Sequence, residues 1–187
     1  TSYNISLRTS YINRLVAPLA KRLLDVEQSD FGYSDINLKF HHKFTENSSL
    51  SLSTYQGIDK VGFATTTFND EYPDIAALKA DNSIDWRNNV VSLRYSHLLS
   101  EKLFLSFSAS TVNYSLDSRS SNFYNTVITP DSVLTEELDV FANSQISDRN
   151  LRLDMEYNFN NAHEALFGAG VSNHIYNPSV ISKEVVV

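Results

Sequence analysis

The sequence predicts an all-β fold: a segment of a transmembrane antiparallel up-and-down β-barrel with about seven strands. Two observations support this prediction. Apolar and polar residues alternate with a period of two, as they do in strands whose two faces meet different surroundings. The connections alternate strictly between long and short, which is typical of outer-membrane barrels with short periplasmic turns and longer extracellular loops.

The alternation is clearest in residues 35–44 and 150–159. Their apolar residues share one face of a strand: Ile36, Leu38, Phe40 and Phe44 in the first, and Leu151, Leu153, Met155, Tyr157 and Phe159 in the second. Weaker alternation predicts five further strands, at residues 3–11, 50–58, 86–98, 103–114 and 165–176. The last is the least regular, because Gly168 and Gly170 fall on its polar side.

The connections set the direction of the strands. Short turns are predicted at residues 45–49, 99–102 and 160–164, and long loops at residues 13–30, 64–84 and 118–144. An up-and-down meander places all short turns at one end and all long loops at the other. We therefore expect the first strand to run outward to the cell surface, and the last long loop to be mobile because it is rich in Ser, Asn, Asp and Thr.

The first long loop contains a predicted helix, from Arg14 to Val26. Leu15, Leu19 and Leu23 recur at four-residue spacing, and Pro18 falls early, where a first helical turn tolerates it. A helix that covers the loop is the main interpretation, and an anchor lying on the membrane is the alternative.

Aromatic residues collect near the predicted strand ends. Three lie by the short turns and four toward the long loops: Phe44, Phe104 and Phe159, then Tyr11, Tyr33, Trp86 and Tyr114. This distribution predicts aromatic girdles at both membrane interfaces. The alternative is that aromatic residues favour strands of any kind.

The composition excludes several function classes. The net charge of −7 excludes a basic nucleic-acid footprint, and the absence of cysteine excludes disulfides and thiolate metal sites. No run approaches the roughly 18 apolar residues of a transmembrane helix. The mean hydropathy of −0.26 is compatible with a membrane barrel, because lumen-facing polar residues cancel lipid-facing apolar ones.

The sequence predicts neither a metal site nor a catalytic site. The adjacent His41 and His42 point to opposite faces of a regular strand and cannot chelate one ion together. No nucleophile elbow or spaced triad is present, and Asp154 and Glu156 share their face with Arg152 as in a charge ladder. We therefore expect no enzyme activity, no catalytic residue, no metal and no cofactor.

Charged residues on the polar face are the better functional candidates. An Arg or Lys facing lipid at mid-bilayer costs about 2–4 kcal/mol, so these side chains need water, protein or one another. The candidates for a lumen-facing or plug-facing role are Arg8, Asp35, Lys39, Arg87, Arg94, Arg152, Asp154 and Glu156.

Four segments, taken in order, carry a family resemblance. The first is Ser6 to Asn13, similar to an Arg-x-Ser-Tyr-x-Asp stretch with Asn13 in place of the Asp. The others are the hairpin with Tyr33, Asp35, Lys39, Tyr55, Gly57 and Asp59, the hairpin from Trp86 to Phe104, and the ending with Phe167, Gly168, His174, Tyr176 and Pro178. Together they resemble the barrel of Bacteroidetes-type TonB-dependent outer-membrane receptors.

The resemblance implies that residues 1–187 are a partial β-barrel domain, about seven strands of a barrel that has about 22. The plug domain and the closing strands would lie outside this chain. It implies a multi-pass protein of the bacterial outer membrane that imports a scarce nutrient: a siderophore, a haem-like ligand, an oligosaccharide or a peptide. The implied partners are outer-membrane lipid, the plug domain of the same parent chain, the TonB complex acting through that plug, and a small-molecule or oligomeric ligand.

Three alternatives remain open. A passive porin or structural barrel would lack a plug and conduct ions. A soluble β-sandwich or lipocalin-like binding domain would turn its apolar face inward and fold without detergent. An outer-membrane enzyme would require a reactive serine and a histidine within hydrogen-bonding reach.

Overall fold

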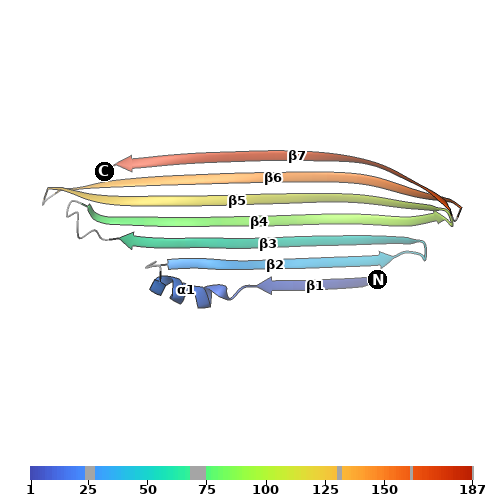
Figure 1. Ribbon diagram of the computed structural model, residues 1–187, viewed down its shortest axis with the longest axis horizontal. Helices are drawn as coiled ribbons and strands as arrows, with labels where there is room; N and C mark the ends of the chain where they lie inside the picture. The colour runs from blue at the N-terminus through green and yellow to red at the C-terminus, as the bar shows by residue number, and fades with distance from the viewer. Residues whose placement is uncertain (24–27, 68–74, 130–131, 161, 187) are drawn as a thin grey trace.

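Seven strands form one antiparallel sheet in the part of the chain that the computed structural model describes, which is residues 1–23, 28–67, 75–129, 132–160 and 162–186. Each strand pairs with the next along the chain (Figure 1). The strands are β1 Ser2–Thr9, β2 Gln28–Lys43, β3 Ser48–Thr67, β4 Ile75–Ser100, β5 Leu103–Thr129, β6 Ser132–Asn160 and β7 His163–Val186. The predicted all-β, up-and-down, seven-strand architecture is confirmed.

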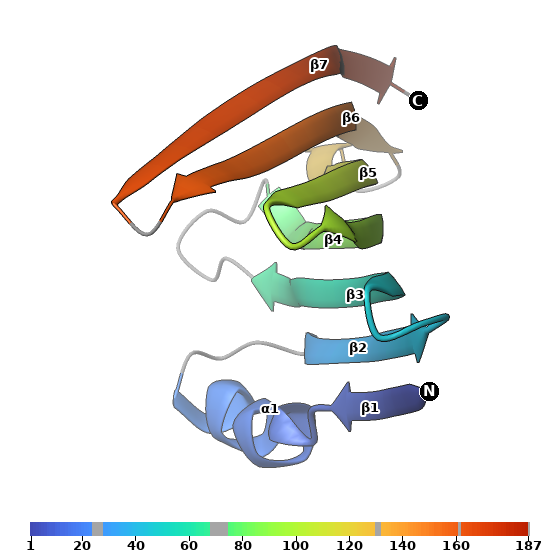
Figure 2. The ribbon, with the colours of Figure 1, turned by 90° about the vertical axis from the view of Figure 1, so that its right-hand side faces the viewer.

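The sheet is open and forms a single layer. Figure 2 shows the strands stacked from β1 to β7, with the β6–β7 hairpin inclined to β2 and β3 as the sheet twists. Within the described ranges β1 and β7 are the two edges and do not pair with each other. Closure of the sheet into a barrel therefore stays a prediction.

The strands are much longer than the alternation predicts. Two of the predicted long loops, residues 64–84 and 118–144, are mostly paired strand. Hydrogen bonds between strands join main-chain groups and do not depend on the side chains. They therefore continue through these stretches, although Ser, Thr and Asn occupy both faces. The prediction of long loops there was wrong, and residues 68–74 and 130–131 of those loops lie outside the described part of the chain.

The helix α1 (Ile12–Leu23) lies beside the half of β2 that β1 does not pair (Figure 1). Ala20 is buried, the amide of Phe31 donates to Asn13 Oδ1 at 3.4 Å, and the amide of Tyr33 donates to Ser10 Oγ at 2.9 Å. The helix thereby covers an otherwise open sheet edge. It begins two residues before the predicted start, and the predicted end at Val26 falls outside the described residues.

The described residues contain no enclosed hydrophobic core. Ala20 and Ala64 are the apolar residues buried there, whereas large apolar side chains such as Leu7 and Val171 are 72 % and 62 % exposed. No helix among the described residues is long and apolar enough to cross a membrane. The apolar face of the sheet consequently requires contact with something outside this layer.

Candidate functional site

One face of the sheet carries a continuous apolar surface near the short turns. Residues paired across an antiparallel sheet lie on the same face, so the strand register assigns every side chain to one side. We call this surface the apolar band. Its members are Tyr3, Ile5, Leu7, Ile36, Leu38, Phe40, Leu50, Leu52, Val91, Leu93, Tyr95, Leu103, Leu105, Phe107, Ala109, Leu151, Leu153, Met155, Tyr157, Ala165, Phe167, Ala169 and Val171.

The apolar band ends sharply along β2, β4, β5 and β6. On β6 it runs from Leu151 to Tyr157, and Phe159 continues the same face to the turn, a stretch close to the roughly 9–11 residues with which a tilted strand crosses a hydrocarbon core. The next residues of β6 on that face are Arg149, Ser147 and Gln145. The face that is apolar near the short turns therefore becomes polar where the strands continue.

Aromatic and histidine side chains form a girdle at the short-turn end of the apolar band. Ring pairs join Phe40 to His42 at 6.3 Å between centroids, His42 to Phe44 at 4.8 Å, Tyr95 to His97 at 5.9 Å and Tyr157 to Phe159 at 4.7 Å. The phenolic oxygen of Tyr95 is also 2.8 Å from His97 Nδ1. An amphipathic ring in such a row has an apolar body and a polar edge, as membrane interfaces favour.

The predicted girdle residues divide between the two faces. Phe44 and Phe159 lie at the short-turn end of the apolar band. Four of the others point to the opposite face by register: Tyr33, Trp86, Phe104 and Tyr114. Tyr11 precedes α1 and places its ring 5.5 Å from the Arg14 guanidinium. Position near a strand end does not determine the face, so these four residues do not share a face with Phe44 and Phe159.

The opposite face, which we call the charged face, gathers the predicted lumen-facing residues except Arg87. They are Arg8, Asp35, Lys39, Arg94, Arg152, Asp154 and Glu156. One row across the sheet reads His41, Ser51, Arg94, Ser108, Arg152 and Gly170. Ser108 thus separates the two arginines, and Ser51 separates Arg94 from His41, an arrangement that emerges only from the register.

A tight ion pair ties β1 to β2 on the charged face. Arg8 Nε donates to both carboxylate oxygens of Asp35 at 3.0 Å, and Arg8 Nη2 lies 2.8 Å from Asp35 Oδ2. The Asp35 side chain is only 7 % exposed, whereas that of Arg8 is 64 % exposed. Gly57 pairs with Asp35, so Arg8, Asp35 and Gly57, which the family resemblance singled out, come together at one place.

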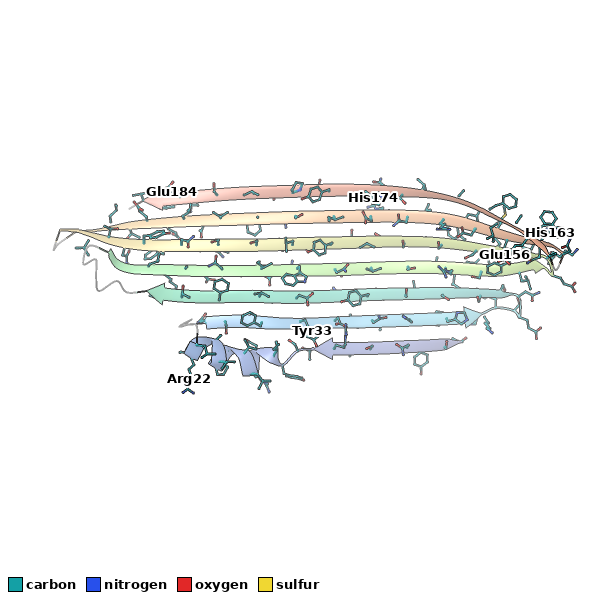
Figure 3. The ribbon with its side chains drawn as sticks, in the orientation of Figure 1. Arg22, Tyr33, Glu156, His163, His174 and Glu184 are labelled. Atoms are coloured by element: carbon teal, nitrogen blue, oxygen red, sulfur yellow. The ribbon has the colours of Figure 1, made fainter. Side chains whose placement is uncertain are left out.

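A pocket of about 350 Å³ opens on the charged face between β6 and β7. Arg152 Nε donates to the two Asp154 oxygens at 2.9 and 2.8 Å, and Asn158 Nδ2 donates to Glu156 Oε1 at 3.3 Å. Figure 3 labels Glu156 and His163 toward the end of the β6–β7 hairpin. Gly168 provides the space, because a Cβ there would meet Asp154 Oδ1 at 2.8 Å.

We predict that Gly168→Val displaces the Asp154 carboxylate from Arg152 and lowers the free energy of unfolding by at most about 1 kcal/mol, because the displaced group is the end of a flexible, partly exposed side chain. Urea titration of the intact protein measures the loss. Ser172→Val, on the same face of β7, is the control and should change stability little because its side chain is exposed. Equal effects of the two substitutions would contradict the role assigned to Gly168.

Arg87 lies on the side of the sheet that carries the apolar band, beyond its end. Its Nη1 is 3.2 Å from Asp117 Oδ2, and Asn143 Nδ2 donates to Asp117 Oδ1. The expectation that Arg87 shares a face with Arg94 is wrong, because the two positions are an odd number of residues apart on β4. Arg87 belongs to a polar network on the extended part of the strands.

The charged face offers ion pairs and hydroxyl groups rather than a metal centre. His174 Nδ1 lies 2.7 Å from Asp148 Oδ1, and His41 Nδ1 lies 2.9 Å from Ser51 Oγ. Across the described part of the chain, no group of three or more His, Asp or Glu side chains could hold a metal ion. Such a surface suits contact with water, with a polar protein surface or with a hydrogen-bonding solute.

Comparison with known proteins assigns no family. No family model and no curated protein matches the chain. Among solved structures, two variants of the Rh. blastica porin align at 8 % identity, covering 92 % and 97 % of this chain and 100 % of theirs, each with a TM-score of 0.15. A TM-score this low supports no conclusion about fold or function.

Proposed function

We propose that this chain is part of an outer-membrane β-barrel whose apolar band contacts lipid and whose charged face lines the lumen. The observation that carries the proposal is the one-layer sheet, which near the short turns gathers its large exposed apolar side chains in a continuous band on one face and its charged side chains on the other. Exposed apolar area costs about 25 cal/mol per Å² in water, and hydrocarbon removes that cost. A water-filled or protein-filled lumen equally satisfies the arginines and carboxylates of the charged face.

We further propose that the parent protein is a TonB-dependent receptor that imports a scarce nutrient across the bacterial outer membrane. Support comes from the sequence resemblance and from Arg8, Asp35 and Gly57, which belong to its motifs and lie together. In this function the charged face contacts a plug domain of the same parent chain. A siderophore, haem-like ligand, oligosaccharide or peptide binds at the outer side, and the TonB complex shifts the plug.

Cysteine labelling tests which face meets lipid. Single cysteines replace Leu38, Phe107 and Leu153 on the apolar band, and Lys39, Ser108 and Arg152 on the charged face. In native membranes we expect the first set to react with a lipid-phase probe and the second set to be protected from it. The chain has no cysteine of its own to compete. A soluble product with the first set shielded would indicate a β-sandwich and refute the barrel.

Ion conductance separates a plugged receptor from a passive porin. We expect the intact protein in planar bilayers to conduct little current, since a plug fills the lumen, and ligand uptake by cells to depend on the TonB complex. A large steady conductance together with TonB-independent uptake would favour the porin and would leave the lipid-facing assignment of the apolar band intact.

A further inference from the structure

An apolar groove crosses the apolar band where the band ends, and an arginine stands at its mouth. The groove holds about 460 Å³ and is open to the outside. Ala109 forms its floor between Leu93 and Leu151, which are its register partners on β4 and β6. The small side chain of Ala109 between two leucines leaves a trough in the apolar band.

The mouth of the groove is polar. The adjoining row across the sheet reads Val91, Thr111, Arg149 and Asn173. Arg149 is exposed, and no ion pair joins it to any residue in the described ranges. The closest acidic residues of β4 and β5 on this face, Asp85 and Asp117, lie several residues farther from the band, and Asp117 is already paired with Arg87.

We propose that this groove binds one acyl chain of an anionic membrane lipid and that Arg149 binds its phosphate headgroup, with the Asn173 amide as a second donor. The inference rests on the proposed membrane-facing role of the apolar band. The chemistry fits that occupant, because the apolar trough ends in a guanidinium at the depth where hydrocarbon gives way to headgroups. A guanidinium binds phosphate oxygens in a bidentate manner and repels no part of an anionic lipid.

Lipid retention by the intact purified protein tests the site. The probes are phosphatidylglycerol and phosphatidylcholine with identical acyl chains, counted on the protein by native mass spectrometry. We expect phosphatidylglycerol to be retained preferentially, and Arg149→Gln to weaken its retention about tenfold, as expected for the loss of one charge-assisted hydrogen bond. Arg152→Gln, on the opposite face of the same strand, should leave retention unchanged.

A second pair of variants tests the groove itself. Ala109→Phe fills the trough and should reduce retention of both lipids, whereas Ala169→Phe adds the same ring to the band outside the groove and should not. Unchanged retention in Arg149→Gln, or equal losses in Arg149→Gln and Arg152→Gln, overturns the site. If the wild-type protein inserts into vesicles without lipid preference, only this site fails. If it does not insert at all, the barrel fails with it.

Discussion

Replacing Leu153 by Arg is expected to lower the free energy of unfolding in a bilayer by about 2–4 kcal/mol, the cost of a cation facing lipid at the midplane. Leu153 stands in the middle of the apolar band, with Phe107 and Ala169 as its register partners. No acidic side chain shares that part of the face, so the guanidinium has no partner to offset its desolvation. Urea titration of the intact protein refolded into vesicles measures the change.

Asn150→Arg is the matched control for Leu153→Arg. Asn150 belongs to the same strand but lies on the charged face, between the serines Ser110 and Ser172. A cation there meets water or a polar surface, and we expect stability to change by less than about 1 kcal/mol. If both substitutions destabilise equally, or if Leu153→Arg is neutral, the apolar band does not face hydrocarbon.

Replacing Arg8 by Gln is expected to lower the free energy of unfolding, because it leaves the Asp35 carboxylate without its charged donor. We expect the loss to be larger than that for an ion pair in which both side chains are exposed. The difference arises from the burial of Asp35, whose side chain is only 7 % exposed. Because the Arg8 side chain is 64 % exposed, we expect a smaller loss of stability than for an ion pair in which both side chains are buried. Urea titration of the intact protein measures the loss, and hydrogen exchange of the β1 amides should rise with it because the pair ties β1 to β2.

Two further variants make the Arg8 result specific. Arg8→Gln combined with Asp35→Asn removes both charges and should recover most of the lost stability in a double-mutant cycle. Arg119→Gln breaks a looser pair, 3.9 Å from Asp139, and should cost at most about 1 kcal/mol. If the Arg119 variant loses as much as the Arg8 variant, or if the double variant recovers nothing, the special role of the Arg8–Asp35 pair is refuted.

Local sequence patterns predicted the strands in which one face is apolar and the other is polar. The alternation in 35–44 and 150–159 located strands within β2 and β6 and assigned Leu38 and Leu153 to one face. The short turns and the helix at α1 were also located, because turn composition and four-residue spacing are local signals. Each of these features depends on residues close together in the chain.

The structure alone shows how far the strands extend. Beyond the apolar band, Ser, Asn, Asp and Thr occupy both faces of β5 and β6, so the alternation disappears while backbone pairing continues. Hydrogen bonds between main-chain groups require no particular side chain. A polar paired strand and a polar loop therefore have the same composition, and the predicted loop at residues 118–144 was mostly strand for that reason.

Within each strand, the sequence by itself determined the order of polar and apolar side chains, and with it the division of the turn-proximal sheet into two chemically different faces. The tertiary structure decided which residues meet across strands: the Arg8–Asp35 pair, the pocket that Gly168 opens, the separation of Arg87 from Arg94, and the trough at Ala109 below Arg149. The physical reason is register. A shift of one residue moves a whole strand's side chains to the other face, and only pairing between distant segments selects the alignment.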